Sequence, residues 1–274
     1  MATRLNELLW SAIGDLRLHP VRKWIRATAG DRVVVDSRRA CLVWEPRRVV
    51  PSYAVPVEDV AGELVPAGAS EADEHAVHVQ GFAVLDPTTS FGVHSAPGAP
   101  LTIRTPDGDL TGAAFRPDDP DLSGYVVLDW HAFTTWLEEE ETVIGHPHDP
   151  FDRIDCLRSS RRVQISSGGV ELADSTRPTL LFETPLPTRF YLPVEDVASG
   201  LLEPSGTRTT CAYKGRASYW SARIQDTLLP DIAWSYPDPL HDAKPVRGMI
   251  AFFTERLDLS IDGVPQERPR TPWS

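Results

Sequence analysis

The segment Cys211-Ala212-Tyr213-Lys214-Gly215 places a thiol three residues from an amine. A nearby ammonium group stabilises a thiolate and makes it more nucleophilic. Gly215 can adopt positive φ, which would turn the chain and bring Lys214 over a sheet. Cys211 and Lys214 are therefore candidate catalytic residues. The alternative is that Cys211 is a small buried apolar residue and Lys214 a solvated turn residue.

A carboxylate and a guanidinium lie about thirty residues earlier, on or beside neighbouring predicted strands. Glu183 is the candidate acid or base; since no histidine lies near Cys211 in the sequence, only the fold could bring Glu183 or His241 to that thiol. Arg189 is the candidate anchor for an anionic substrate group, with Tyr191 beside it. The alternative is a structural Glu–Arg pair at the end of a strand.

The same part of the chain is rich in aromatic side chains, which could form the walls of a ligand pocket. Aromatic residues also favour strands, so ordinary packing is the alternative. We expect Tyr213, Tyr219 and Trp234 in the pocket. Trp220 shares its predicted strand face with Ala222 and is expected in the core.

A long repeat must position these residues. The stretch Asp36–Val60 recurs as Asp174–Val197, with Asp-Ser, an arginine, an apolar pair, an aromatic-Glu pair and the ending Pro-Val-Glu-Asp-Val in the same order. The repeat predicts two tandem domains, a degenerate copy over residues 1–145 and a copy with the candidate site over 151–274. Glu45 and Tyr53 recur in the first copy without a Cys-Lys segment, which favours structural roles for Glu183 and its aromatic neighbour.

Short apolar runs separated by Gly, Pro and Asp turn signals predict an all-β fold, a sandwich or rolled sheet with short helices. The 25 prolines disfavour long helices. We expect one amphipathic helix from Leu5 to Leu16, loops with a few edge strands over residues 62–106, and a polar tail over 264–274. The acidic run Glu138–Glu141 is expected to be a solvated turn or strand edge.

Charge and composition limit the partners. The net charge of −12 repels phosphate backbones and argues against a nucleic-acid partner. Three scattered cysteines form neither a disulfide framework nor a C-x-x-C zinc motif, so we expect reduced thiols, a cytoplasmic location and no metal or cofactor. Neither a signal peptide nor an apolar run of membrane-spanning length is present, so no membrane partner is expected. The expected partner is a small molecule, which could be anionic.

Several blocks together resemble domain-of-unknown-function family 427, in its tandem two-copy form. They are LRSSRRVQI, ADSTRPTLLFETPLPTRFYLPVEDV, CAYKGRASYWS, DIAWSYPDPL and GMIAFFTERLDLSIDGV, in family order through 152–263. The first half carries the repeat and a weaker echo of the last block, LSGYVVLDW. The resemblance implies two β-tent-like domains and no settled activity, although members are sometimes labelled nucleotidyltransferases.

Two functions stay open at this point. The first is an enzyme acting on a small molecule, with Cys211, Lys214 and Glu183 as its reactive groups. The second is a non-catalytic binding module with an aromatic-walled pocket. Nucleotidyl transfer fits less well, because the closely spaced carboxylates are poorly placed for Mg²⁺: Asp119 and Asp121 lie in a proline loop, and the adjacent Glu195 and Asp196 point apart outside a helix. The glycine pair Gly168-Gly169 lies in a predicted hairpin rather than before a helix.

Overall fold

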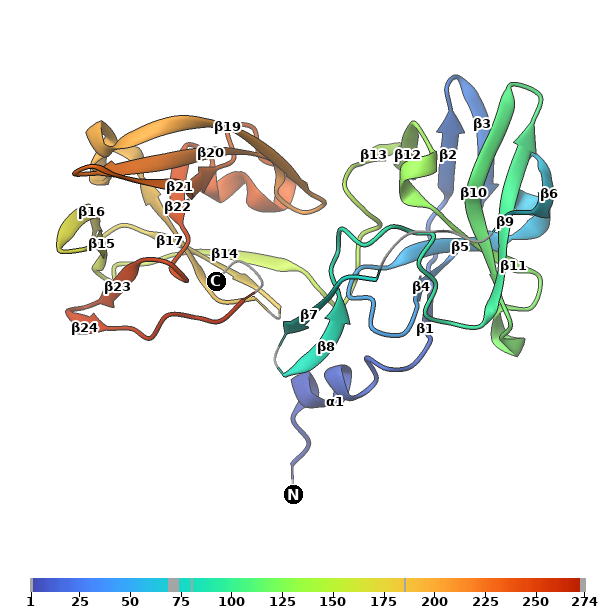
Figure 1. Cartoon of the computed structure of the whole chain (residues 1–274), viewed down its shortest axis with the longest axis horizontal. Coiled ribbons are helices and arrows are strands. Elements are labelled where there is room, and N and C mark those ends of the chain that lie inside the picture. The colour runs from blue at the N-terminus through green and yellow to red at the C-terminus, as the bar shows by residue number, and fades with distance from the viewer. Residues whose placement is uncertain (1, 69–73, 80, 185, 272–274) are drawn as a thin grey trace. The chain divides into compact units, whose positions relative to one another are not determined.

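The protein is described here by a computed structural model covering residues 2–68, 74–79, 81–184 and 186–271. The chain divides into two compact units, Met1–Asp149 (unit 1) and Pro150–Ser274 (unit 2). Both are built almost entirely from antiparallel strands (Figure 1), which confirms the all-β prediction. In the described residues, no helix is both long enough and apolar enough to span a membrane.

Unit 1 contains a seven-stranded sheet, a four-stranded sheet and a two-stranded hairpin. The larger sheet has the order β1 (Arg17–Pro20), β4 (Cys41–Trp44), β5 (Ser52–Pro56), β11 (Tyr125–Leu128), β10 (Gly108–Pro117), β9 (Gly98–Thr105) and β6 (Glu63–Pro66). The smaller has β13 (Glu141–Val143), β12 (Thr135–Glu138), β2 (Ile25–Ala29) and β3 (Arg32–Ser37). The other elements are β7 (Ala76–Val79), β8 (Phe82–Leu85), α1 (Leu5–Ser11) and the 3₁₀ turns Val57–Asp59, Pro120–Leu122 and Trp130–Ala132.

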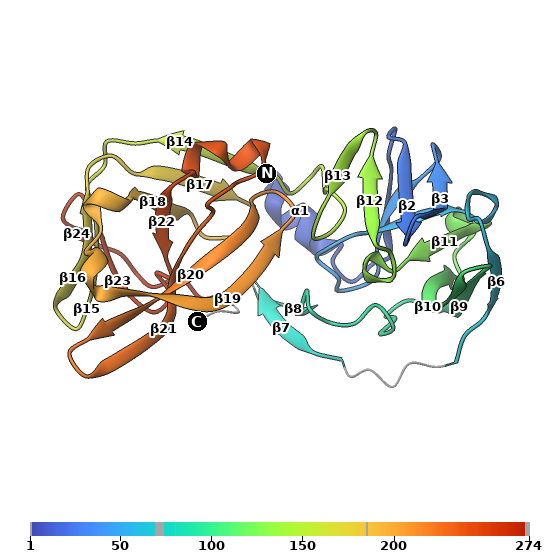
Figure 2. The same cartoon turned by 90° about the horizontal axis from the view of Figure 1, so that it is seen from above.

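Unit 2 has a seven-stranded and a four-stranded sheet, seen from two directions in Figures 1 and 2. The larger has the order β14 (Ile154–Arg158), β17 (Thr179–Glu183), β18 (Arg189–Pro193), β22 (Met249–Phe252), β21 (Thr227–Ser235), β20 (Gly215–Ile224) and β19 (Leu202–Cys211). The smaller has β16 (Val170–Ser175), β15 (Val163–Ser167), β23 (Asp258–Ile261) and β24 (Val264–Pro265). Three 3₁₀ segments are η4 (Val194–Asp196), η5 (Ser199–Leu201) and η6 (His241–Val246).

The two large sheets have the same strand topology. In each, the first strand of the unit pairs with the fourth and the fourth pairs with the fifth, and the sheet ends with a run of antiparallel neighbours in reverse chain order. Each repeated stretch contributes two adjacent central strands, β4 and β5 in unit 1 and β17 and β18 in unit 2. The repeat therefore occupies the same place in the strand order of both units.

The repeated polar residues form the same serine–aspartate hydrogen bond in each unit. In unit 2 the Ser175 hydroxyl donates to Asp196 at 2.7 Å, and Asp196 also accepts from the Arg177 guanidinium at 2.8 Å. In unit 1 the Ser37 hydroxyl donates to Asp59, also at 2.7 Å. These bonds tie the end of one strand to the 3₁₀ turn of the Pro-Val-Glu-Asp-Val ending. The motif that reveals the repeat is thus structural.

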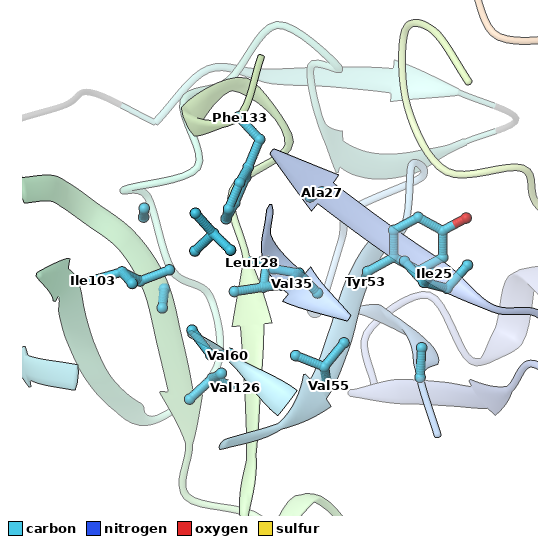
Figure 3. Close-up of a cluster of buried hydrophobic side chains, with 14 of the residues drawn as sticks. Ile25, Ala27, Val35, Tyr53, Val55, Val60, Ile103, Val126, Leu128 and Phe133 are labelled. Carbon is cyan, nitrogen blue, oxygen red and sulfur yellow. The ribbon is translucent and has the colours of Figure 1, made fainter. Parts of the chain in front are cut away.

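The main core of each unit lies between its two sheets, because one face of each sheet is apolar. In unit 1, Ile25 and Ala27 from the small sheet pack against Val55 and Leu128 from the large one (Figure 3). In unit 2, residues from both sheets form the equivalent cluster, which includes Ile165, Leu180, Leu192 and Ile250. Buried apolar area of this kind is the main stabilising contribution to such a fold.

The predicted N-terminal helix is too long. The helix α1 ends at Ser11, and the chain then enters β1, whose residues pair with β4 through Leu18↔Val43 and His19↔Leu42. Leu16 packs in a small cluster of unit 1 rather than on a helix. Strand pairing therefore overrides the helical spacing of the leucines here. The tail expected over 264–274 begins with β24, but 272–274 lie outside the described residues, as do 69–73 and 80 of the expected loop region.

The acidic run Glu138–Glu141 was expected to be solvated, and for Glu138 this is wrong. Glu139, Glu140 and Glu141 are exposed, but Glu138 is buried at the end of β12. Its carboxylate accepts hydrogen bonds from the Tyr53 hydroxyl and from the Lys23 amine. Alternation along β12 directs Glu138 inward together with Trp136, and this overrides the charge pattern.

Candidate functional site

The candidate residues of unit 2 gather on one face of its large sheet. Paired residues share a face and successive residues alternate. The registers Thr179↔Tyr191, Tyr191↔Ala251, Trp234↔Ala251 and Tyr219↔Trp234 therefore place one set of side chains together. We call this the site face; it also carries Glu183, Arg189 and, through Cys211↔Gly215, Cys211.

The opposite face of the same sheet carries the core described above, and Trp220 packs there with Ala222. Tyr219, its neighbour, packs on the site face with Trp234. Trp220 and Tyr219 therefore lie on opposite faces of β20, with Trp220 toward the core as predicted. The 3₁₀ segment η6 lies against the site face through Ala243 and Val246.

The β19–β20 turn brings Lys214 to the edge of the site face. Gly215 has φ +101°, a conformation that side chains rarely tolerate, as the sequence predicted for this position. A Cβ at Gly215 would also lie 3.3 Å from the Asp238 carbonyl oxygen. The Leu240 amide donates to the Lys214 carbonyl at 3.1 Å and holds the turn against the next segment.

Lys214 is buried and forms an ion pair with Glu183. Burial disfavours the ammonium and would lower the pKa of Lys214, but the attraction of Glu183 outweighs burial, so this pKa lies above its ordinary value. Lys214 is therefore held as an ammonium rather than as a nucleophilic amine. Its interpretation as a solvated turn residue is wrong, because 9% of the residue is exposed.

Arg189 forms a second buried ion pair on the site face. Its two terminal nitrogens donate to the two carboxylate oxygens of Glu255 at 2.8 and 2.6 Å. The Thr271 hydroxyl adds a donor to Glu255 at 2.8 Å, and the Arg189 guanidinium carbon lies 5.4 Å from the Trp234 ring centroid. Glu183 and Arg189 thus do not pair with one another. Each has a partner of opposite charge elsewhere.

Two tyrosines lie among these charged pairs. The fully buried Tyr191 hydroxyl accepts from the Trp234 indole nitrogen at 2.9 Å. Burial raises the pKa of Tyr191 far above its ordinary value, and the pKa of the neighbouring Tyr236 is raised for the same reason. Both hydroxyls stay neutral at any physiological pH. The Tyr219 hydroxyl lies 2.9 Å from that of Thr209, nearer the solvent.

The thiol of Cys211 is protonated near neutral pH. Burial raises its pKa, and the Glu183 carboxylate adds to the effect; Lys214 and the backbone amides of Tyr213 and Lys214 oppose it without reversing it. Burial also raises the pKa of Cys156, which lies across the sheet beside Leu181. The expected activation of Cys211 by Lys214 is thus outweighed by desolvation and by the negative charge of Glu183.

Unit 1 has a different arrangement at the matching place in its sheet. Glu45 follows β4 as Glu183 ends β17, and Glu45 is buried. Its carboxylate is 3.0 Å from the His94 Nδ1 and accepts from the amides of Ser95 and Ala96 at 2.9 and 3.2 Å. The His94 ring stacks on Phe115 with centroids 3.7 Å apart. The donors to Glu45 lie just before β9, and Lys214, the donor to Glu183, lies just before β20. The corresponding segment therefore supplies the donors in both units.

The predicted site set is brought together, although its members pair differently from expectation. Cys211, Glu183, Arg189, Tyr191, Tyr219 and Trp234 share the site face, and Lys214 and Tyr213 lie in the turn at its edge. Tyr213 is buried, with the Arg153 guanidinium carbon 5.3 Å from its ring centroid. Sequence reasoning missed Glu255 and His94, whose partners are distant in the chain, and Tyr236, which packs on the site face. The roles assigned to the predicted residues remain predictions.

Across the residues that the structure describes, no three or more His, Cys, Asp and Glu side chains gather in a group that could hold a metal ion. The comparison with curated proteins gave no match. Residues 155–263 match a family described as a domain of unknown function, DUF427. Unit 2 is thus similar to DUF427 domains over the β-strands that carry the site face.

Proposed function

We propose that unit 2 is a small-molecule binding module whose ligand contacts the site face around Lys214, Glu183, Tyr191 and Trp234. The observation that carries the proposal is the pair of buried ion pairs on one sheet face. Burying two ions costs several kcal/mol per ion before their attraction is counted, and apolar residues of similar size are often at least as stable. Buried ionisable groups concentrated at one place are typical of functional sites.

The rest of the site face fits recognition of a small molecule. Tyr191, Tyr236 and Cys211 offer neutral hydrogen-bonding groups, and Trp234 and Tyr219 offer aromatic surface. Binding sites typically combine aromatic walls with a few placed polar groups. The acidic net charge of the chain agrees with a small-molecule partner rather than a nucleic acid.

A thermal-shift screen of the full chain with a metabolite library tests the proposal, since a ligand that binds the native state raises the apparent stability. The matched variant is Lys214→Met/Glu183→Leu, which removes both charges of one pair while filling its space. We expect library members that stabilise the wild type and leave this folded double variant unchanged. Hits that stabilise both proteins equally would move the binding site away from Lys214.

An enzyme is the second candidate, because Lys214 and Glu183 form a direct ammonium–carboxylate contact that could move a proton. In this version Glu183 and Lys214 act as acid and base, and Cys211 is not the nucleophile. Mass spectrometry of each screening hit after incubation with the protein separates the two functions. Conversion of a hit, lost in the double variant, supports the enzyme; an unchanged ligand supports the binding module.

A further inference from the structure

The two cations predicted for the site, Lys214 and Arg189, each already have their own carboxylate. Lys214 is paired with Glu183, and Arg189 with Glu255, so the two pairs together carry no net charge. We infer that the ligand of this face carries no charged group: a neutral molecule with an apolar or aromatic part and hydroxyl or amide groups. This inference rests on the proposed binding function, and it replaces the expectation that Arg189 or Lys214 anchors an anion.

The guanidinium of Arg189 is already bound to a carboxylate. Both of its terminal nitrogens donate to Glu255, in the two-pronged geometry that an anionic ligand would otherwise use. Glu255 also accepts from Thr271, so its carboxylate is fixed by three donors. An incoming carboxylate or phosphate would have to displace a buried, fully hydrogen-bonded partner. The Arg189 guanidinium therefore donates to the Glu255 carboxylate and packs against the Trp234 ring.

The Lys214 ammonium is neutralised in the same way. Its side chain is 11% exposed and that of Glu183 is 9% exposed, so both charges have left bulk water together. A second anion near Lys214 would also lie near Glu183 and be repelled by it. Desolvating a charged ligand without a free counter-charge is strongly unfavourable. The pair thus provides a polar surface without a net attraction for anions.

The remaining groups on the site face are neutral donors and acceptors. The hydroxyls of Tyr191 and Tyr236 and the thiol of Cys211 keep their protons. Hydroxyl and amide groups of a ligand form hydrogen bonds with such groups without any change of charge. The rings of Trp234 and Phe253, 4.5 Å apart, offer the apolar contact.

The experiment compares charge preference in wild type and in Glu183→Gln, using the best hit of the library as a matched carboxamide and carboxylate. The readout is the dissociation constant of each from isothermal titration calorimetry. In wild type we expect the carboxamide to bind about tenfold or more tightly than the carboxylate. Glu183→Gln frees the charge of Lys214, so this ratio should fall or reverse. Glu45→Gln, which changes the matching acid of unit 1, should leave it unaltered.

The outcomes distinguish failure of the neutral-ligand inference from failure of the binding function. A carboxylate that binds wild type as tightly as, or more tightly than, its carboxamide overturns the neutral-ligand inference and leaves the binding function intact. A library without any hit on wild type overturns the binding function itself. If Glu183→Gln does not fold, Glu255→Gln frees the charge of Arg189 instead and is expected to shift the same ratio toward the carboxylate.

Discussion

Lys214 and Glu183 form their ion pair among aromatic and aliphatic side chains, and this determines what each residue can do. The carboxylate keeps the lysine protonated, and burial keeps the nearby Cys211 thiol protonated. Neither group is an activated nucleophile in this state. At the scale of single residues, these protonation states agree with the proposed recognition of polar groups.

Removing only one partner of the ion pair should destabilise unit 2. Lys214→Met leaves the buried Glu183 carboxylate without its counter-charge, and we expect a loss of about 3–5 kcal/mol in the free energy of unfolding. Lys214→Met/Glu183→Leu removes both charges and should lie within about 1 kcal/mol of wild type. Chemical denaturation of wild type and the two variants measures both values. Equal losses in the single and double variants would contradict a direct coupling of Lys214 with Glu183.

The three cysteines should differ in their rates of alkylation. Burial raises the pKa of all three, that of Cys41 to about 11, and Cys156 is the least buried. Because the thiolate is the reacting form, iodoacetamide should label Cys211 of the native protein more slowly than free cysteine at pH 7. Peptide mass spectrometry over time measures each rate. If Cys211 were labelled faster than Cys156, its thiol would be activated, and the enzyme would be favoured over the binding module.

Strand alternation explains most of the arrangement at the scale of elements. It divides β20 between core and site face, and it turns Glu138 inward at the end of β12. The sequence predicted strands beside Glu183, where an apolar run lies between turn signals, and β17 (Thr179–Glu183) lies there. It overextended the first helix, because the pairing of β1 with β4 has no local signature.

Contacts between distant segments could not be predicted from local patterns. His94 lies 49 residues from Glu45, in a stretch rich in glycine and proline, and nothing near either residue indicates their pairing. Glu255 follows Arg189 by 66 residues, so their bidentate ion pair could not be predicted from local sequence either. The residues of the site face were predicted from their types; their partners depend on sheet register, which the sequence does not specify.

Glu138 should make the stability of unit 1 depend on pH. Burial would raise its pKa, but hydrogen bonds from His148, Lys23 and Tyr53 outweigh burial and lower the pKa to about 2, from 4.5. A lowered pKa means that the carboxylate stabilises the fold above pH 4.5, and that this contribution is lost as the pH falls toward 2.

Glu138→Gln is therefore expected to lower the free energy of unfolding at pH 7 by about 2–3 kcal/mol and to flatten its decline between pH 4.5 and 2. The control is Glu141→Gln, an exposed neighbour in the same acidic run, which should behave as wild type. Urea titrations at several pH values measure both. A decline as steep in Glu138→Gln as in wild type would place the titrating group elsewhere.

The whole molecule consists of two units with the same strand order in their large sheets. We propose that they are copies of one ancestral module, as the repeat of Asp36–Val60 in Asp174–Val197 indicates. Glu45, which corresponds in unit 1 to Glu183 of unit 2, is bound by His94 and two backbone amides. We expect one ligand per chain, because Ala54 and Phe115 stand in unit 1 where Tyr191 and Trp234 stand in unit 2.

Unit 2 should fold when expressed without unit 1. Residues 150–274 contain two complete sheets and the core between them, so their thermal unfolding should show one cooperative transition. Circular dichroism in the near and far ultraviolet measures it. A fragment with a gradual, non-cooperative melt would show that unit 2 depends on unit 1 for its stability.

The most direct test titrates the best screening hit into the full chain and into Lys214→Met/Glu183→Leu by isothermal titration calorimetry. We predict saturable binding of one ligand per wild-type chain, weakened about tenfold or more in the double variant while its unfolding stays cooperative. Equal affinity in the two proteins, with the double variant folded, would contradict the claim that the Lys214–Glu183 pair forms the binding site.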